Sequence, residues 1–219
     1  MSLADRIGTS FRERRMRQFL ALCQPTPTTN VLDVGGNPRI WASVPQSERP
    51  NILYLNTPRS FEDGDDRTRL VFGDGTRLPF PDRAFDLAFS NSVIEHVGSE
   101  AKQQAFAKEI RRVAKSYWVQ TPNHGFPIEP HLLTPFIHWF PMTVRKAIVQ
   151  RFTVWDLVAK PSPDSRRFYI EHFLYDIRLL DRSQITALFP DAQIIAEPFG
   201  PFTKSWIAYR KENNHAVSH

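Results

Sequence analysis

The sequence predicts an α/β fold built on a doubly wound, mostly parallel seven-stranded sheet that ends in an antiparallel hairpin. Three observations support this prediction: short apolar runs recur along the 219 residues, helical or irregular segments separate most of them, and the last two runs stand close together. Short buried strands that alternate with helices are typical of parallel sheets, because helices cover both faces of such sheets.

The first element is an amphipathic helix over residues 1–23. Phe11 and Phe19 recur near helical spacing with arginines between them. Pro25 and Pro27 follow, and proline ends helices because it lacks a backbone N–H and clashes with the preceding turn.

Seven short apolar runs bounded by turn residues are expected to form the strands. They lie at 30–34, 52–55, 70–72, 85–90, 117–120, 193–197 and 206–210. A short segment with proline and glycine separates the last two, which indicates a hairpin at one edge of the sheet. Helices are expected over about 99–115, where Phe106, Ile110 and Val113 share one face, and near 182–189.

Residues 124–181 interrupt this alternation and are rich in proline and aromatic side chains. We expect them to form a partly helical lid over the carboxyl ends of the strands. The chain is then a single domain over 1–219. Its expected parts are an N-terminal helix (1–24), a core (30–123), the lid insertion (124–181), and a final helix with the hairpin (182–210).

Composition restricts the class of protein. The single cysteine, Cys23, excludes an internal disulfide framework and a cysteine-based zinc site. The first residues lack the apolar core of a signal peptide, and no stretch of 18 apolar residues occurs, so a cytoplasmic protein is expected. The net charge of +5 includes a cluster at Arg12, Arg14, Arg15 and Arg17, which suits an anionic partner or simply keeps the protein in solution.

The first motif with chemical content is Asp33 followed by Gly35, Gly36 and Asn37. A strand ends there, and ligands of doubly wound sheets bind at the carboxyl edge. Glycine lets the backbone approach a ligand closely, and an acid can meet a cationic group such as an α-ammonium. An ordinary tight turn is the alternative.

Two further motifs follow the next two strands. Asn56 is placed to hydrogen-bond ribose hydroxyls, or to form a simple turn before Pro58. The segment Asp74, Gly75 and Thr76 is placed to accept a hydrogen bond from an adenine amino group, or to form a capped turn. Each reading requires the side chains to meet at the same edge of the sheet.

The fourth motif opens at the end of the strand over 85–90. Asn91 and Ser92 are candidates for lining the same ligand. His96 is a candidate general base, because the pKa of histidine lies near neutrality. The alternative is that His96 packs against the sheet.

The order and spacing of these four motifs resemble the class I S-adenosylmethionine-dependent methyltransferases and, within them, the methyltransferase type 11 group. The resemblance covers about residues 30–123, the expected cofactor-binding core, and agrees more weakly with the final helix and hairpin. It implies a Rossmann-like fold, S-adenosylmethionine as cofactor and S-adenosylhomocysteine as product.

The resemblance also implies residue roles. The segment from Asp33 to Asn37 would hold the methionine part of the cofactor, Asn56 the ribose, and the segment from Asp74 to Thr76 the adenine. Two features depart from the family pattern: Asn37 and Arg39 stand where the second and third glycines of the turn are usual, and Asn56 replaces the ribose-binding acid.

Residues after the fifth strand are candidates for the methyl acceptor. Glu129 and His131 could bind or deprotonate it, with His138 and His172 as further candidates, or could fix the insertion through hydrogen bonds. Their spacing matches no helical metal motif, so no metal is expected. The apolar run 132–141 could be the core of the lid, line an acceptor pocket, or touch a membrane.

The sequence therefore predicts methyl transfer to a small or lipid-linked metabolite, with peripheral membrane contact as an option. Nucleic acid is not favoured, because the Asn/Asp-Pro-Pro-aromatic signature is absent and Cys23 precedes the first strand. The alternatives are a catalytically silent S-adenosylmethionine-binding module and an RNA-directed methyltransferase. A nicotinamide-dependent dehydrogenase would require Gly-x-Gly-x-x-Gly, which is missing after the first strand.

Overall fold

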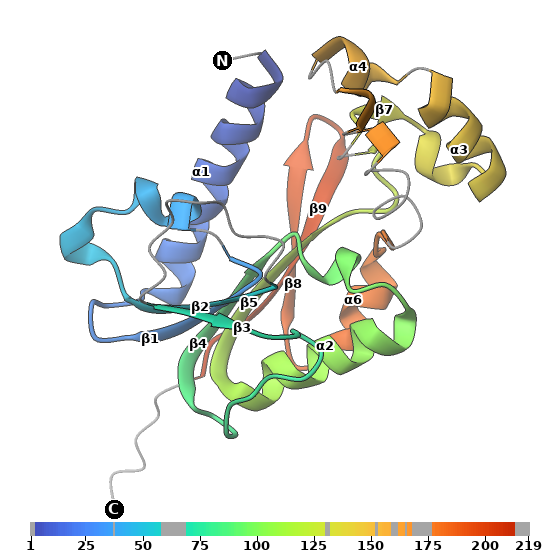
Figure 1. Cartoon of the computed structure of the whole chain (residues 1–219). Helices are drawn as coiled ribbons and strands as arrows, with labels where there is room; N and C mark the ends of the chain where they lie inside the picture. The colour runs from blue at the N-terminus through green and yellow to red at the C-terminus, as the bar shows by residue number, and fades with distance from the viewer. Residues whose placement is uncertain are drawn as a thin grey trace, which may run out of the picture.

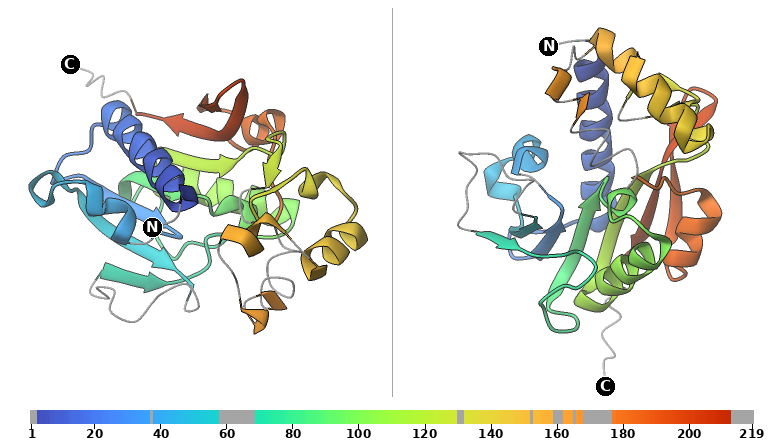
Figure 2. Two further views of the ribbon diagram at one scale, coloured as in Figure 1. Left: turned by 90° about the horizontal axis from the view of Figure 1, so that it is seen from above. Right: turned by 45° about the vertical axis from the view of Figure 1, so that its right-hand side comes forward.

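A central sheet with helices on both faces forms the body of the protein (Figure 1). The computed structural model describes residues 3–36, 38–57, 69–129, 132–151, 153–158, 162–164, 166–167 and 177–212. Helix α1 covers one face of the sheet, while α2 and α6 cover the other, as the two views of Figure 2 also show.

The sheet contains seven strands in the order β3-β2-β1-β4-β5-β9-β8. The first five strands in this order are parallel to one another, whereas β9 runs antiparallel to both β5 and β8. The order reverses between β1 and β4, so the topological switch point lies between these strands. The predicted fold is confirmed. The strands are β1 (Asn30–Val34), β2 (Asn51–Asn56), β3 (Leu70–Phe72), β4 (Phe85–Asn91), β5 (Ala114–Pro122), β8 (Gln193–Phe199) and β9 (Phe202–Arg210).

Three helices pack on the sheet: α1 (Leu3–Cys23), α2 (Glu100–Val113) and α6 (Arg182–Leu188). The Ser99 side chain accepts a hydrogen bond from the backbone of Lys102 and so caps the start of α2. Helix α2 ends two residues earlier than its charge pattern predicts, because Ala114 is already extended and pairs with Phe85 of β4. Between β1 and β2 the chain forms two short 3₁₀ helices, η1 (Pro38–Ser43) and η2 (Gln46–Glu48).

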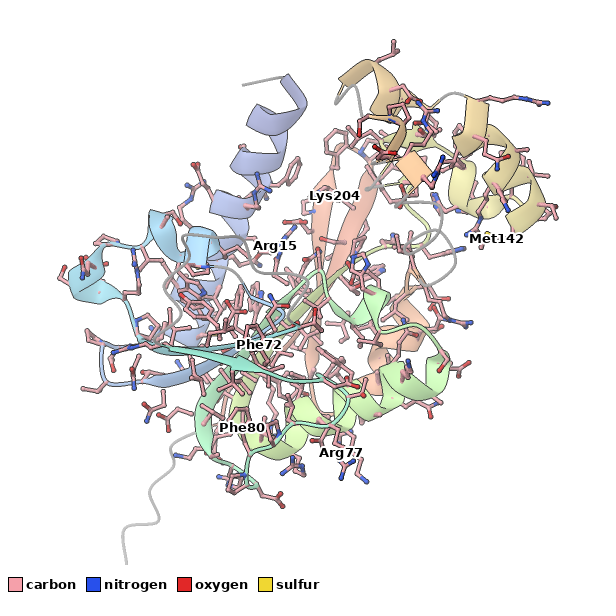
Figure 3. The ribbon with its side chains drawn as sticks, in the orientation of Figure 1. Arg15, Phe72, Arg77, Phe80, Met142 and Lys204 are labelled. Atoms are coloured by element: carbon pink, nitrogen blue, oxygen red, sulfur yellow. The ribbon has the colours of Figure 1, made fainter. Side chains whose placement is uncertain are left out.

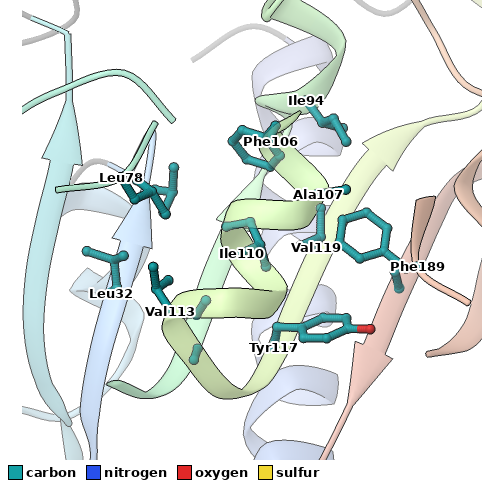
Figure 4. Close-up of a cluster of buried hydrophobic side chains, with 14 of the residues drawn as sticks. Leu32, Leu78, Ile94, Phe106, Ala107, Ile110, Val113, Tyr117, Val119 and Phe189 are labelled. Carbon is teal, nitrogen blue, oxygen red and sulfur yellow. The ribbon is translucent and has the colours of Figure 1, made fainter. Parts of the chain in front are cut away.

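Apolar side chains fill both sides of the sheet. Under α2 and α6, the layer includes Leu32, Phe106 and Ile110 (Figure 4). Under α1, the ring of Phe19 meets those of Phe89 and Trp41 edge-on, with centroids 4.9 and 5.7 Å apart. Burial on both faces explains why β1 has no alternating pattern in the sequence.

The insertion leaves the sheet after β5 and returns to the same place. Asn123 and Leu180 form a parallel bridge, and the backbone N–H of His124 donates to the Leu180 carbonyl (3.0 Å). This agrees with the predicted insertion after the fifth strand. Its described elements are β6 (Ile128–Glu129), β7 (Thr134–Pro135), η6 (Ile137–Trp139), α3 (Met142–Arg151) and α4 (Val154–Val158). Within the described residues, every helix is too short or too polar to cross a bilayer.

Candidate cofactor and acceptor site

The turn after β1 requires glycine at two consecutive positions. Gly35 has a φ of 75°, and a Cβ there would lie 2.4 Å from a methyl of Val93. A Cβ on Gly36 would lie 2.0 Å from the carboxyl carbon of Asp33. The backbone N–H of Gly35 donates to the Leu55 carbonyl (2.7 Å), which fixes the turn against β2. The turn therefore lies between the ends of β2 and β4.

Asp33 carries a carboxylate that is fully buried at the end of β1. Its Oδ2 accepts a hydrogen bond from the indole N–H of Trp41 (2.7 Å), but its buried Oδ1 has no hydrogen-bond partner among the described residues. Burial raises the pKa of Asp33 to about 7, and the Trp41 hydrogen bond only partly opposes this effect. A cation that reached Oδ1 would supply the compensation that the described part of the chain does not provide.

Asn56, predicted to bind ribose, is engaged with the protein. Its Nδ2 donates to the Gly36 carbonyl (3.0 Å), and its Oδ1 accepts from the backbone N–H of Thr57 (2.9 Å). A carboxylate cannot donate a hydrogen bond at neutral pH. The replacement of the usual acid by asparagine is therefore explained by the turn, which Asn56 holds against the end of β2.

The Asp74 loop lies beside the end of β1. Asp74 is exposed, and its Oδ1 accepts from the backbone N–H and the hydroxyl of Thr76 (both 2.8 Å). A Cβ on Gly75 would lie 2.8 Å from the Phe106 ring and 3.2 Å from Val34. The loop thus has the geometry of the capped turn, and it stands next to the strand that carries the glycine turn.

Asn91 and Ser92 complete the cluster at the end of β4. Ser92 has a φ of 56°, its N–H donates to the Gln120 carbonyl and its hydroxyl donates to the Gln120 side chain, both at 3.0 Å. Asn91 Oδ1 accepts from a guanidinium N–H of Arg15 (2.5 Å). Among the predicted cofactor residues, Asn37 lies outside the described residues.

A buried ion pair above this edge was not predicted. The Arg15 guanidinium donates to both carboxylate oxygens of Glu197 in β8 (3.1 and 2.7 Å), and the two side chains are only 7% and 4% exposed. Ser205 donates to the same carboxylate and Lys204 Nζ lies 3.7 Å from it (Figure 3). Burial would raise the pKa of Glu197, yet the charge and hydrogen bonds of Arg15 outweigh it and hold this pKa below its usual value.

The sequence did contain a signal for Arg15. It stands midway between Phe11 and Phe19, four residues from each, and so lies on the apolar face of α1 rather than with the exposed Arg12 and Arg14. An arginine on a buried helical face needs a partner, and the partner is 182 residues away.

The catalytic candidates occupy two places. His96 lies on η5 (Ile94–His96), and its Nε2 is 3.9 Å from Oε1 of the buried Glu95. Glu129 is buried in the insertion, where one carboxylate oxygen accepts from the backbone N–H of Leu132 (2.6 Å). His131 and His172 lie outside the described residues.

Glu129 lines a cavity of about 450 Å³ in the insertion. His138 also lines it, and its Nε2 is 3.0 Å from the His124 carbonyl, so this nitrogen carries the proton. Burial lowers the pKa of His138, which keeps the ring neutral at pH 7. Arg178, another lining residue, donates its backbone N–H to the Glu95 carbonyl (2.8 Å), so the cavity adjoins η5.

Three comparisons bear on this arrangement. The model of a family described as a methyltransferase domain matches residues 52–117. A candidate methyltransferase of Encephalitozoon cuniculi is 46% identical over 46 residues, which are 21% of this chain and only 22% of that protein.

Solved structures share the fold at low identity. The PH0226 protein of Pyrococcus horikoshii is 14% identical with a TM-score of 0.56, over 96% of this chain and 92% of its own. The magnesium protoporphyrin IX methyltransferase of Synechocystis, solved with bound S-adenosylhomocysteine, is 12% identical with a TM-score of 0.55, over 94% and 85%. Residues 52–117 therefore match a methyltransferase domain family, and the chain as a whole shares the fold of these two solved structures.

Proposed function

We propose that this protein binds S-adenosylmethionine at the carboxyl edge of β1, β2 and β4 and transfers its methyl group. The observation that carries the proposal is the buried Asp33 carboxylate, whose Oδ1 finds no donor among the described residues. It lies next to a turn where a Cβ at either glycine would clash with neighbouring side chains. The methionine end of the cofactor has an α-ammonium and a sulfonium, and either cation suits a carboxylate in this position.

The remaining cofactor residues surround this point. Asn56 fixes the turn through Gly36, so its contribution to the ribose site is mainly positional. The loop of Asp74, Gly75 and Thr76 borders the same turn and is assigned to the adenine. Asn91 and Ser92 are assigned to the methionine end, together with the glycine turn.

S-Adenosylmethionine, when bound, supplies an electrophilic methyl group on a cationic sulfur and leaves as S-adenosylhomocysteine after an in-line displacement. The protein must align the acceptor and, if the attacking atom holds a proton, remove it. His96, Glu129 and His131 are the candidates for this proton. His96 is half-buried, and its Nε2 lies 3.9 Å from a carboxylate oxygen of Glu95.

The acceptor is assigned to a small or lipid-linked metabolite. A cavity of about 450 Å³ adjoins η5, and polar side chains such as Glu129 and His138 line it together with apolar ones such as Leu132. This mixed lining suits a small acceptor that carries polar groups. The RNA alternative loses support, because Arg15 of the basic cluster is buried and paired with Glu197.

Calorimetric titration with S-adenosylmethionine and S-adenosylhomocysteine tests cofactor binding, and a matched glycine pair sharpens it. G36A forces a methyl against the Asp33 carboxylate and should abolish binding, whereas G125A meets its nearest atoms at an ordinary 3.5 Å and should retain it. Equal binding by the two variants would refute the site. Release of S-adenosylhomocysteine with candidate acceptors then separates an enzyme from a silent binding module.

A further inference from the structure

Large aromatic side chains are exposed at one end of the molecule. Phe136, Trp139 and Phe140 of the insertion and Phe199 and Phe202 of the β8–β9 hairpin are each 39–50% exposed. We call these five residues the aromatic rim. Scattered apolar side chains are normal on a surface, but a group of large rings at one place marks an interaction site.

The two parts of the rim are connected through the start of the insertion. The Phe126 ring lies 5.7 Å from that of Phe199 and 6.4 Å from that of Phe202. The next residue, Pro127, accepts a hydrogen bond from the backbone N–H of Phe136 (2.7 Å). The hairpin tip and the insertion therefore form one continuous surface rather than two isolated patches.

The rim lies at the same end as the cofactor edge. Strand β8 is parallel to β5, because β9 runs antiparallel to both, so Phe199 at the end of β8 lies at the carboxyl edge of the sheet. The insertion begins where β5 ends. Figures 1 and 2 place the hairpin tip, the insertion and the start of α1 together at this end.

The charge around the rim is positive. Residues 132–151 contain Arg145, Lys146 and Arg151 and no acidic side chain. Helix α3 also has an open apolar groove formed by Val144, Ala147 and Ile148, which ends at Arg151. Cations beside exposed rings are typical of helices that lie in the headgroup region of an anionic bilayer.

Trp139 fits this environment in a further respect. Its indole N–H donates to the His124 carbonyl (3.0 Å), so its polar atom is satisfied inside the protein while the ring is 48% exposed. Such a ring can enter the acyl region without leaving an unpaired donor there.

We infer that the aromatic rim docks on an anionic phospholipid surface and that the protein takes a lipid-borne acceptor there. The lipid-borne acceptor rests on the proposed function, since it requires methyl transfer at the cofactor edge. Docking through the aromatic rim would turn this edge toward the lipid headgroups. The docking itself rests on the aromatic rim and on the basic side chains of residues 132–151. Because these side chains are all positively charged, an anionic lipid surface suits them better than a second copy of the same chain.

Vesicle sedimentation tests the docking directly. At low salt, the full chain should sediment with vesicles of phosphatidylcholine and phosphatidylserine and remain in solution with phosphatidylcholine alone. F140S and F202S each remove one exposed ring and should weaken binding by about tenfold, and K146E by about fivefold. F72S is the matched control, because Phe72 is equally exposed at 50% but belongs to β3, the outermost strand on the side of the sheet away from β8 and β9 (Figure 3).

Trp139 provides a second, spectroscopic readout. Because its ring is 48% exposed while Trp41 and Trp118 are fully buried, the blue shift on adding vesicles and the quenching by brominated lipids should both be smaller in W139F than in the wild type. Near-wild-type circular dichroism of each variant excludes misfolding as the cause.

Three results would overturn the inference. The first is that the protein fails to sediment with anionic vesicles at low salt. The second is that F72S and F202S lose vesicle binding to the same extent. The third is that light scattering shows a dimer that F140S dissociates, while vesicle binding is absent. Calorimetry with S-adenosylmethionine separates this test from the proposed function, because the rim variants should bind the cofactor normally. Vesicle binding without cofactor binding would refute the function and leave the docking surface intact.

Discussion

The buried carboxylate of Asp33 makes a sharp prediction for D33N. The substitution keeps an oxygen that can accept the Trp41 indole N–H, while it removes the charge that burial disfavours. The pKa of Asp33 rises from 3.8 to about 7 on folding, and each pKa unit is worth about 1.4 kcal/mol. Burying the charged form therefore costs about 4 kcal/mol above pH 7, and D33N avoids this cost.

The sign follows from proton binding. Between about pH 4 and 7 the native state holds a proton on Asp33 that the unfolded state has lost, so the wild type loses stability as the pH rises through this window. The stability of D33N relative to the wild type should increase by about 4 kcal/mol across the same window and stay constant above it. For a chain of this size, the gain corresponds to roughly 8–16 °C in melting temperature at pH 8.

Urea unfolding of the two proteins at pH 4, 5, 6, 7 and 8 measures the difference directly. The comparison removes the contribution of other carboxylates such as Glu197, which are common to both proteins. A stability difference that does not change with pH would refute the burial argument. If the cofactor cation meets Asp33, D33N should also lose affinity for S-adenosylmethionine, and the affinity of the wild type should rise with pH and level off above about 7.

Three further outcomes are expected. N56D should weaken S-adenosylmethionine binding at least tenfold by calorimetry, because a carboxylate cannot donate to the Gly36 carbonyl. Stronger binding would instead show that recognition of the ribose dominates. E197Q should destabilise the fold by about 3–5 kcal/mol in urea unfolding, since it leaves Arg15 buried with a neutral partner. The double variant R15M/E197M should recover part of this loss, and losses that simply add would contradict the pairing. D181A should cost about 1 kcal/mol in the same assay by removing the capping box of α6, and an unchanged midpoint would show that the cap does not contribute.

Sequence patterns predicted the parts of the fold that local chemistry determines. The strand from Asn30 to Val34 and the turn at Gly35 were recognised because a buried parallel strand and a glycine turn each leave a short, continuous signature. The end of α2 was misplaced, since Arg112 and Lys115 favour a helical end equally well and only pairing with β4 decides where the strand begins.

Pairings over long separations could not be predicted in this way. Nothing near Glu197 in the sequence indicates Arg15, because the contact depends on α1 crossing the sheet above the β8–β9 hairpin. Asn56 shows the same limit. Its residue type suits a contact with a ribose hydroxyl, which stays a prediction, but the sequence does not indicate that its Nδ2 donates to the Gly36 carbonyl in the turn after β1.

The replacement of the usual acid by Asn56 also has an electrostatic explanation. A Cβ on Gly36 would meet the Asp33 carboxylate, and the Gly36 carbonyl accepts a hydrogen bond from Asn56. An acid at position 56 would therefore stand near a carboxylate that is already hard to ionise. Two neighbouring carboxylates raise each other's pKa, and the edge would then hold a proton at neutral pH instead of the charge that attracts a cation. A neutral amide at position 56 lets Asp33 ionise near pH 7. At that pH, one cationic group of the ligand is enough to shift Asp33 fully to its charged form.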